Sequence, residues 1–101
     1  MSEVEVRDAR QQHRYEAVVD GAVAGFSQYR LSEGVITFVH TVVDDAYEGQ
    51  GIGSRLVRGA LDDVRRSSHL KVVAECPFVK AYIDRHAEYA DLLAGSGFGA
   101  D

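Results

Sequence analysis

"AYEGQGIGSRL", residues 46–56, places three glycines within five positions directly before a helix-like run. Glycine weakens a helix interior, so its repeated use at a helix start indicates a special requirement of the backbone. Either the chain turns sharply there, or a ligand approaches the backbone more closely than side chains would allow. Such glycines let backbone N–H groups converge at a helix N-terminus, where the helix dipole favours negative charge. We therefore weigh a phosphate cradle built from main-chain amides against a plain strand-to-helix turn.

The segments before this stretch have the patterns of strands. Residues 13–19 and 22–31 flank Asp20-Gly21, a hairpin signal. Residues 35–43 follow a second turn and are apolar at nearly every position, which is typical of a strand covered on both faces. The first half is therefore predicted to be an antiparallel β-meander that ends in a central strand.

After the glycines, the apolar period changes to that of a helix. Apolar residues recur at helical spacing along one side of residues 52–64. Residues 69–75 are short and β-rich, residues 77–86 begin with a proline suited to a first helical position, and residues 87–94 resemble a last short helix. The predicted order β-β-β-α-β-α is an α/β fold, in which a β-α-β crossover and C-terminal helices follow the meander.

Composition narrows the class of protein. A chain of 101 residues is expected to form one domain over residues 1–101. Roughly the first ten and the last six residues are expected to be flexible. The net charge of −5 argues against a broad nucleic-acid-binding surface. No apolar run is long enough to span a bilayer, so no membrane partner is expected.

The cysteine count and the start of the chain favour a cytoplasmic protein without a metal. Cys76 is the only cysteine, which excludes an intrachain disulfide and a cysteine-based zinc site. The first residues are polar and lack the apolar core of a signal peptide.

The commonest phosphate-binding loops do not fit these glycines. A Walker loop requires Gly-Lys-Ser/Thr, and no lysine follows the glycines. The dinucleotide fingerprint G-x-G-x-x-G would need a third glycine where Ser54 or Leu56 stands. The strands before the loop are also predicted to be antiparallel, unlike those of a dinucleotide-binding repeat.

The loop instead resembles the coenzyme A loop of the GNAT superfamily of N-acetyltransferases, Gln/Arg-x-x-Gly-x-Gly/Ala. Gly51-Ile52-Gly53 matches its second half, and Glu48 departs from the usual Gln or Arg, which makes the loop less positive. His40-Thr41 and "CPFV…RHAEY", over residues 76–89, resemble motifs of the small, single-domain GNAT-like branch. The resemblance extends over residues 13–93. It implies a minimal GNAT-like acyl-CoA N-acyltransferase fold that binds acetyl-CoA.

The resemblance also implies how the cosubstrate is held. In the superfamily, backbone amides of the loop carry the pyrophosphate of coenzyme A. The end of the central strand splays from its neighbour, and its freed backbone groups bind the pantetheine arm like an added strand. In this chain the implied binding residues are Val42, Val43, Glu48, Gly49, Gln50, Gly51, Ile52, Gly53 and Ser54.

Cys76 and His40 are the candidate catalytic residues. Cys76 precedes Pro77 and is expected at a helix N-cap, where the dipole stabilises a thiolate that could accept an acetyl group. It could equally line the thioester pocket or be a small buried hydrophobe. His40 is placed on the face of Ile36, Phe38 and Val42, from which it could act as the base for Cys76. The alternative for His40 is a core histidine bonded to a backbone carbonyl.

These expectations lead to two functional hypotheses. In the first, the chain is an acetyl-CoA-dependent N-acetyltransferase, with an acceptor that is an amine on a small molecule or a protein. In the second, it is a non-catalytic module that binds coenzyme A or acetyl-CoA. A purely structural protein would require the glycine loop to be a coincidence.

Overall fold

The computed structural model describes residues 3–94. The prediction of a flexible C-terminus falls on residues outside this range. The elements in chain order are β1 (Val4–Ala9), the short 3₁₀ helix η1 (Arg10–Gln12), β2 (Arg14–Val19), β3 (Ala22–Ser32), β4 (Val35–Val43), η2 (Asp45–Tyr47), α1 (Ile52–Ser67), β5 (Lys71–Ala74), α2 (Pro77–Arg85) and η3 (Ala87–Leu92).

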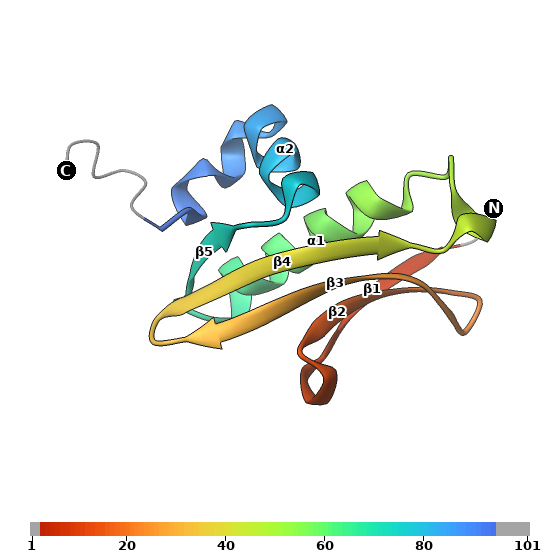
Figure 1. Ribbon diagram of the computed structural model, residues 1–101, viewed down its shortest axis with the longest axis horizontal. Coiled ribbons are helices and arrows are strands. Elements are labelled where there is room, and N and C mark those ends of the chain that lie inside the picture. The colour runs from red at the N-terminus through yellow and green to blue at the C-terminus, as the bar shows by residue number, and fades with distance from the viewer. Residues whose placement is uncertain (1–2, 95–101) are drawn as a thin grey trace.

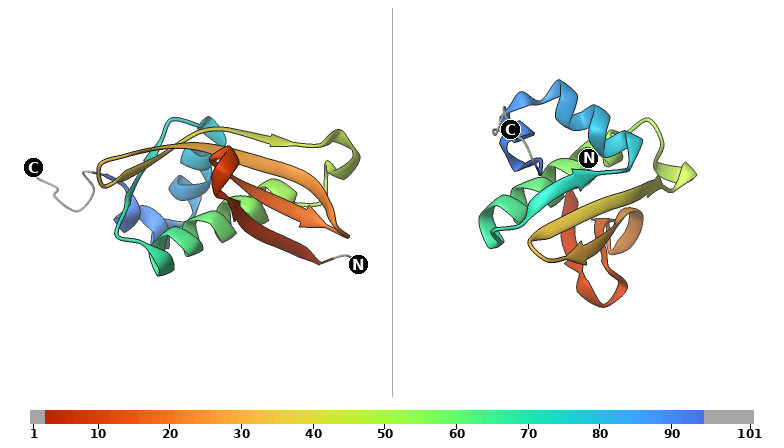
Figure 2. Two further views of the ribbon diagram at one scale, coloured as in Figure 1. Left: turned by 90° about the horizontal axis from the view of Figure 1, so that it is seen from below. Right: turned by 60° about the vertical axis from the view of Figure 1, so that its left-hand side comes forward.

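The strands form one five-stranded sheet in the order β1-β2-β3-β4-β5 (Figures 1 and 2). The first four strands pair antiparallel, each with its neighbour in the chain. β5 pairs parallel to β4, as expected for a strand reached through the crossover helix α1. The predicted α/β fold of a meander followed by a β-α-β crossover is therefore confirmed, and helices follow it.

Strand β1 differs from the prediction. It lies within the N-terminal segment that we expected to be flexible, and it pairs with β2 along its whole length. Its side chains alternate between half-buried and exposed over residues 4–7, with Val4 and Val6 packed against the core. Two apolar residues are a weak sequence signal, and the segment is ordered by its pairing with β2 rather than by its own composition. The last predicted helix is also different, because η3 is a 3₁₀ helix.

Both predicted hairpins are present. Asp20 and Gly21 have φ angles of 51° and 82°, which fits the primed turn that suits the twist of paired strands. Gly34, at φ 71°, turns the chain between β3 and β4. These turns connect the antiparallel strands, so that β4 lies between β3 and β5.

Helices α1 and α2 lie on the same side of the sheet and enclose one apolar core (Figure 2). The inner side of α1 is fully buried at Leu56, Val57, Ala60, Leu61 and Val64. Phe38 of β4 and Val72 of β5 meet it from the sheet. α2 packs at the β5 edge, against β4, β5 and α1. The core thus holds the start of α1 beside the ends of β4 and β5.

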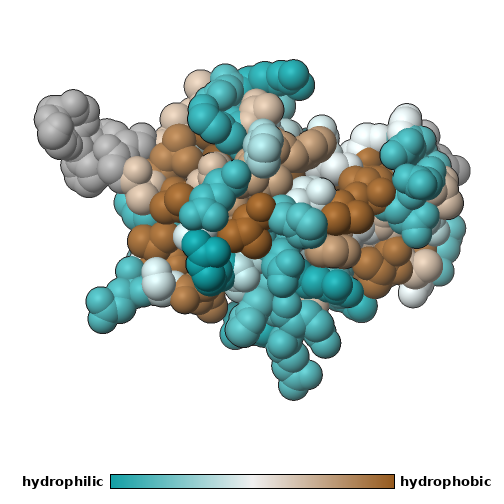
Figure 3. All heavy atoms as spheres, viewed as in Figure 1, coloured by the Kyte–Doolittle hydropathy of each residue, from teal (hydrophilic) through white to brown (hydrophobic). Residues whose placement is uncertain are grey.

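The other face of the sheet carries no helix in the described part of the chain, and Figure 3 looks onto it. Charged side chains lie here among apolar ones. Arg14 lies over the ring of Phe26, 4.4 Å from its centroid, and both Arg14 and Arg7 form ion pairs with the buried Glu16. Within residues 3–94, no helix has the length and apolar character needed to cross a membrane.

Candidate functional site

The pairing of β4 with its neighbour β5 stops where the site is expected. The pairing of β4 with β5 ends at Phe38 and Ala74, while β4 continues to Val43. The carbonyl oxygen of Phe38 accepts hydrogen bonds from the amides of Glu75 and Cys76, at 3.0 and 2.9 Å. Beyond this point the chain of β5 turns into α2. Within the range that the structure describes, residues 3–94, the β5-side edge of β4 is therefore left without a strand partner from residue 39 to residue 43.

A β-bulge at Val39 changes which face His40 occupies. Tyr29 of β3 pairs with Phe38, and the next residue of β3, Gln28, pairs with His40, so Val39 is an extra residue in β4. Because cross-strand partners share a face, Phe38 points to the core and His40 to the open face. The expectation that His40 shares the face of Ile36 and Phe38 is therefore wrong.

His40 is exposed, and its ring lies 6.0 Å from that of Phe26. Val42 shares this open face, since it pairs with Phe26 on β3. Val43 falls on the core side and is half-buried.

Cys76 lies on the core side of the opening. It is the N-cap residue of α2, as predicted, and only 3% of its surface is exposed. Its Sγ lies 3.3 Å from the hydroxyl oxygen of Thr41, which in turn lies 2.9 Å from that of Ser27. The bulge that turns His40 outward turns Thr41 inward. Among the described residues, the polar side chain that meets the thiol is therefore Thr41 and not His40.

The glycine loop turns on two left-handed residues. Gly49 and Gly51 have φ angles of 83° and 73°, and a Cβ on either would project into open space. Both glycines are thus required by the turn, because most side chains are strained at such angles. Gly51 is the N-cap of α1 and supplies no side-chain cap. The amides of Ile52, Gly53 and Ser54 open the helix and have no partner within it.

Gly53 is a glycine for a different reason. A Cβ at this position would lie 2.6 Å from the ring of Phe78, so Gly53 allows α2 to approach the first turn of α1. Ile52 points its side chain into the core with 3% exposure, so any ligand would meet only its main chain. Ser54, by contrast, is exposed at the helix start.

A cavity of about 190 Å³ adjoins the start of α1. Ser54 and Phe78 line it with Arg85, Tyr82 and His86 of the α2 region. The His86 ring stacks on that of Tyr82 at a centroid distance of 3.9 Å, and its Nδ1 lies 2.8 Å from the Tyr82 carbonyl oxygen. Burial raises the pKa of Tyr82, an effect that the charge of Arg58 opposes. An aromatic wall and an arginine thus lie beside the glycine loop.

The charges around the loop are mixed. Glu48 is exposed between η2 and Gly49, and Gln50 is exposed between the two left-handed glycines. Asp44 accepts a hydrogen bond from the Ala46 amide at the start of η2. These carboxylates oppose an anion, whereas the dipole of the 16-residue α1 favours one. The anion-binding capacity of this corner therefore rests on main-chain N–H groups.

Sequence reasoning did not identify Thr41 and Ser27 as part of the site. Thr41 stands in the His40-Thr41 motif, but regular alternation assigns the inward position to the histidine. The bulge that reverses this assignment has no proline, glycine or turn signal in residues 35–43. It is visible only in the pairing of β4 with β3.

Comparison with known proteins supplies evidence on the family of this chain that is independent of the geometry of the site. A family model described as GCN5-related N-acetyl-transferase matches residues 14–92, from the start of β2 to the end of η3. No curated protein matches the chain. The matched segment contains the opening between β4 and β5, the glycine loop and Cys76, and it supports acyl transfer as the general function. The chain belongs to the GCN5-related N-acetyltransferase family.

Proposed function

We propose that this protein binds acetyl-CoA at the opening between β4 and β5 and transfers the acetyl group to an amine. The observation that carries the proposal is the convergence of two sets of main-chain groups at the start of α1. The unpaired edge of β4, residues 39–43, offers peptide groups to the amides of a pantetheine arm. The first amides of α1 offer donors to a pyrophosphate.

The thioester end of the cosubstrate would then lie near Cys76, at the closed end of the opening. In direct transfer, the amine nitrogen attacks the thioester carbonyl, the C–S bond breaks, and the coenzyme A thiolate leaves while the amine gives up a proton. In the covalent alternative, the Cys76 thiolate attacks the thioester carbonyl and the coenzyme A thiolate leaves as its C–S bond breaks. The amine nitrogen then attacks the S-acetyl carbonyl, the bond to Cys76 Sγ breaks, and the Cys76 thiolate is released while the amine gives up a proton. Thr41 would orient the thiol in either case, since its hydroxyl contacts Sγ.

A non-catalytic coenzyme A module is the second candidate. It is favoured by the position of His40, which is exposed on the open face rather than beside Cys76. In that function His40 has no catalytic role. The first proposal instead leaves His40 as a base that acts on an acceptor arriving from the open face.

Binding is tested by calorimetric titration of acetyl-CoA into Gly51→Asp and Gly51→Asn variants. Asn and Asp both tolerate left-handed angles, so the pair differs mainly in charge. We expect Gly51→Asp to bind acetyl-CoA at least about tenfold more weakly than Gly51→Asn, because its carboxylate repels the pyrophosphate. Gly34→Asp and Gly34→Asn are matched controls at φ 71° in the β3–β4 turn and should not differ. Equal affinities for the two Gly51 variants would contradict the proposed phosphate site.

Catalysis is tested separately, by thiol release from acetyl-CoA in the presence of a panel of amines. Turnover that needs an amine supports the transferase, and binding without turnover supports the module. Mass spectrometry of the protein after incubation tests the covalent route, since an acetyl adduct absent from Cys76→Ala assigns it to the thiol. His40→Gln should lower turnover without changing acetyl-CoA affinity if His40 is the base.

A further inference from the structure

A second cavity lies at the opposite end of α1 from the glycine loop. It has a volume of about 310 Å³, within the usual range for small-molecule sites. Its apolar walls are Leu31 and Ile36 of the sheet, Val64 of α1, and Leu70 just before β5. α1 has 16 residues, so its two ends lie about 24 Å apart at about 1.5 Å per residue. The cavity is therefore separate from the proposed acetyl-CoA site.

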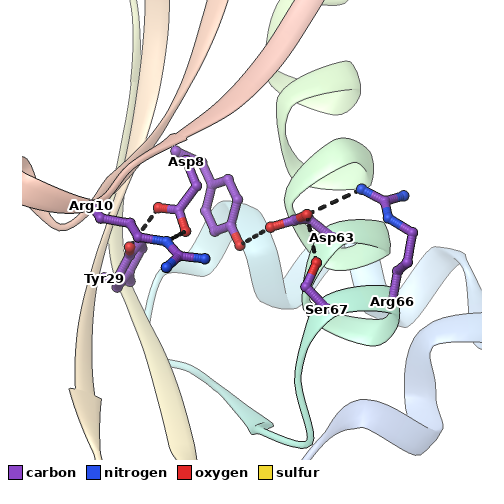
Figure 4. A network of polar contacts seen from close by, with 7 residues as sticks. Asp8, Arg10, Tyr29, Asp63, Arg66 and Ser67 are labelled. Atoms are coloured by element: carbon purple, nitrogen blue, oxygen red, sulfur yellow. Dashed lines mark hydrogen bonds and ion pairs between the residues drawn. The ribbon is translucent and has the colours of Figure 1, made fainter.

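Two tyrosine–aspartate pairs lie in the polar lining of this cavity, which also includes Arg10, His13, Ser67 and Ser68 (Figure 4). The Tyr15 hydroxyl donates to Asp63 Oδ2 at 2.7 Å, and the Tyr29 hydroxyl donates to Asp8 Oδ1 at 2.6 Å. Burial, followed by the hydrogen bond to a carboxylate, raises the pKa of both phenols. Each phenol therefore keeps its proton and directs it at a carboxylate.

This arrangement leaves the cavity rich in acceptors. The phenolic protons are used by the carboxylates, so the phenol and carboxylate oxygens offer only lone pairs to a ligand. Asp8 accepts from Tyr29 and Arg10, whereas a carboxylate has about four acceptor positions. The Arg10 side chain is 82% exposed and that of Asp8 only 19%, so water screens the cation more than the carboxylate. Asp63 likewise accepts from Tyr15, Ser67 and Arg66, and the Arg66 side chain is 72% exposed against 28% for Asp63. A molecule that meets these carboxylate oxygens must supply donors, and positive charge would favour it.

Three aromatic rings also line the cavity, those of His13, Tyr15 and Tyr29. The ring centroids of Tyr15 and Tyr29 lie 5.5 Å apart, and the ring centroid of His13 lies 6.1 Å from that of Tyr29. Cations are attracted to the faces of aromatic rings, most strongly where water is excluded. The aliphatic walls would cover an uncharged stem of a few carbons.

We propose that this cavity binds a small organic cation, namely a primary ammonium group on a short aliphatic stem. The ammonium would donate to Asp8 and Asp63, and the stem would lie against Ile36 and Val64. The site goes beyond acetyl transfer and does not depend on it, since its residues lie at the far end of α1 from the glycine loop.

The test is a titration of the ¹⁵N-labelled protein with pentylamine at neutral pH, followed by amide NMR. Pentan-1-ol and pentanoate are controls with the same stem. We expect pentylamine to bind with a dissociation constant of about 1 mM or below, and the two controls at least about tenfold more weakly. The shifted amides should be those of residues 63–70. Equal affinity for the alcohol, tighter binding of pentanoate, or shifts confined to residues 49–54 would overturn the proposal.

Variants assign the ligand contacts. Asp8→Asn and Asp63→Asn remove one charge each while keeping an oxygen for the tyrosine, and each should weaken pentylamine binding at least about fivefold. Asp91→Asn, at a carboxylate paired with Arg65 outside the cavity, is the matched control and should bind normally. If Asp63→Asn fails to fold, the pentylamine affinity of Asp8→Asn alone tests the proposal. Acetyl-CoA affinity, measured in parallel, should be unchanged by Asp8→Asn, so this proposal and the proposed function fail independently.

Discussion

The two ends of α1 carry their polar groups in different ways. At the N-terminal end, the polar groups are main-chain ones, namely the first amides of α1 and the unpaired edge of β4, and Gly51 adds no side chain. At the C-terminal end they are side chains that bond one another, with Tyr15 to Asp63 and Tyr29 to Asp8. In a site made of main-chain groups, the binding groups are kept as long as the backbone conformation is kept. In a site made of side chains, they depend on the identity of each hydrogen-bonded residue. Substitutions should therefore act differently at the two ends.

The largest effect is expected for Thr41→Val, beside the main-chain site. Valine keeps the shape but removes the hydroxyl that contacts both Ser27 and Cys76. Ser27 is fully buried, so its hydroxyl would lose a partner at a cost of about 1–3 kcal/mol in the free energy of unfolding. Urea unfolding measures this loss of stability. The Ser27→Ala/Thr41→Val double variant should lose less than the sum of the single variants, and simple additivity would argue against the Ser27–Thr41 bond.

A smaller loss is expected for Tyr15→Phe at the other end. The variant deletes the hydrogen bond to Asp63, but that carboxylate keeps Arg66 and Ser67 as donors. We therefore expect a loss of about 1 kcal/mol in the free energy of unfolding. Tyr47→Phe is the matched control, because the Tyr47 hydroxyl takes part in none of the side-chain hydrogen bonds found among the described residues. A loss equal to that of Tyr47→Phe would mean that the Tyr15–Asp63 bond contributes nothing.

The C-terminal end should also respond to acid. Burial acts to raise the pKa of Asp63, but hydrogen bonds from Tyr15 and Ser67, together with Arg66, outweigh it and hold the pKa below 3.8. A pKa lower in the folded state stabilises the fold above the unfolded value, and this contribution is lost as the pH falls through the folded value. Stability should therefore decline below about pH 4, and less steeply in Asp63→Asn. Parallel pH profiles of the two proteins would exclude Asp63 as a source of the decline.

The smallest effect is expected for Glu48→Gln at the glycine loop. The substitution removes an exposed negative charge near the proposed pyrophosphate site, and solvent screens that charge. We expect acetyl-CoA affinity to rise by about two- to fivefold at low salt, with the gain shrinking as salt is added. Glu33→Gln, in the β3–β4 turn, is the control and should bind as the unchanged protein does. A gain that is independent of salt would contradict an electrostatic cause.

Much of the fold follows from local signals in the sequence. Asp20-Gly21 specifies a hairpin because these residue types accept positive φ, and the structure has both in that conformation. Pro77 marks the first residue of α2, and the helical period after Gly51 predicts α1. In each case the conformational preference of one or a few residues is enough to predict the local structure, whatever these residues pack against.

The arrangement of the candidate site does not follow in this way. Local preference identifies Cys76 as an N-cap residue but not its neighbour Thr41, because the bulge at Val39 arises from how β4 pairs with β3. Similarly, the sequence pattern predicts that Gly53 belongs to a ligand loop. Only the position of Phe78 shows that Gly53 allows α1 and α2 to touch.

The sequence by itself determined which segments are strands and helices from residue 13 onward, where the chain turns, and which family it resembles. These properties depend on backbone angles and apolar spacing, which neighbouring residues set. Only the tertiary structure decided that β1 joins the sheet, that His40 points away from Cys76, and that Tyr15 and Tyr29 meet carboxylates from α1 and β1. Such contacts join residues far apart in the chain, so they are fixed by strand pairing and packing and not by any local pattern.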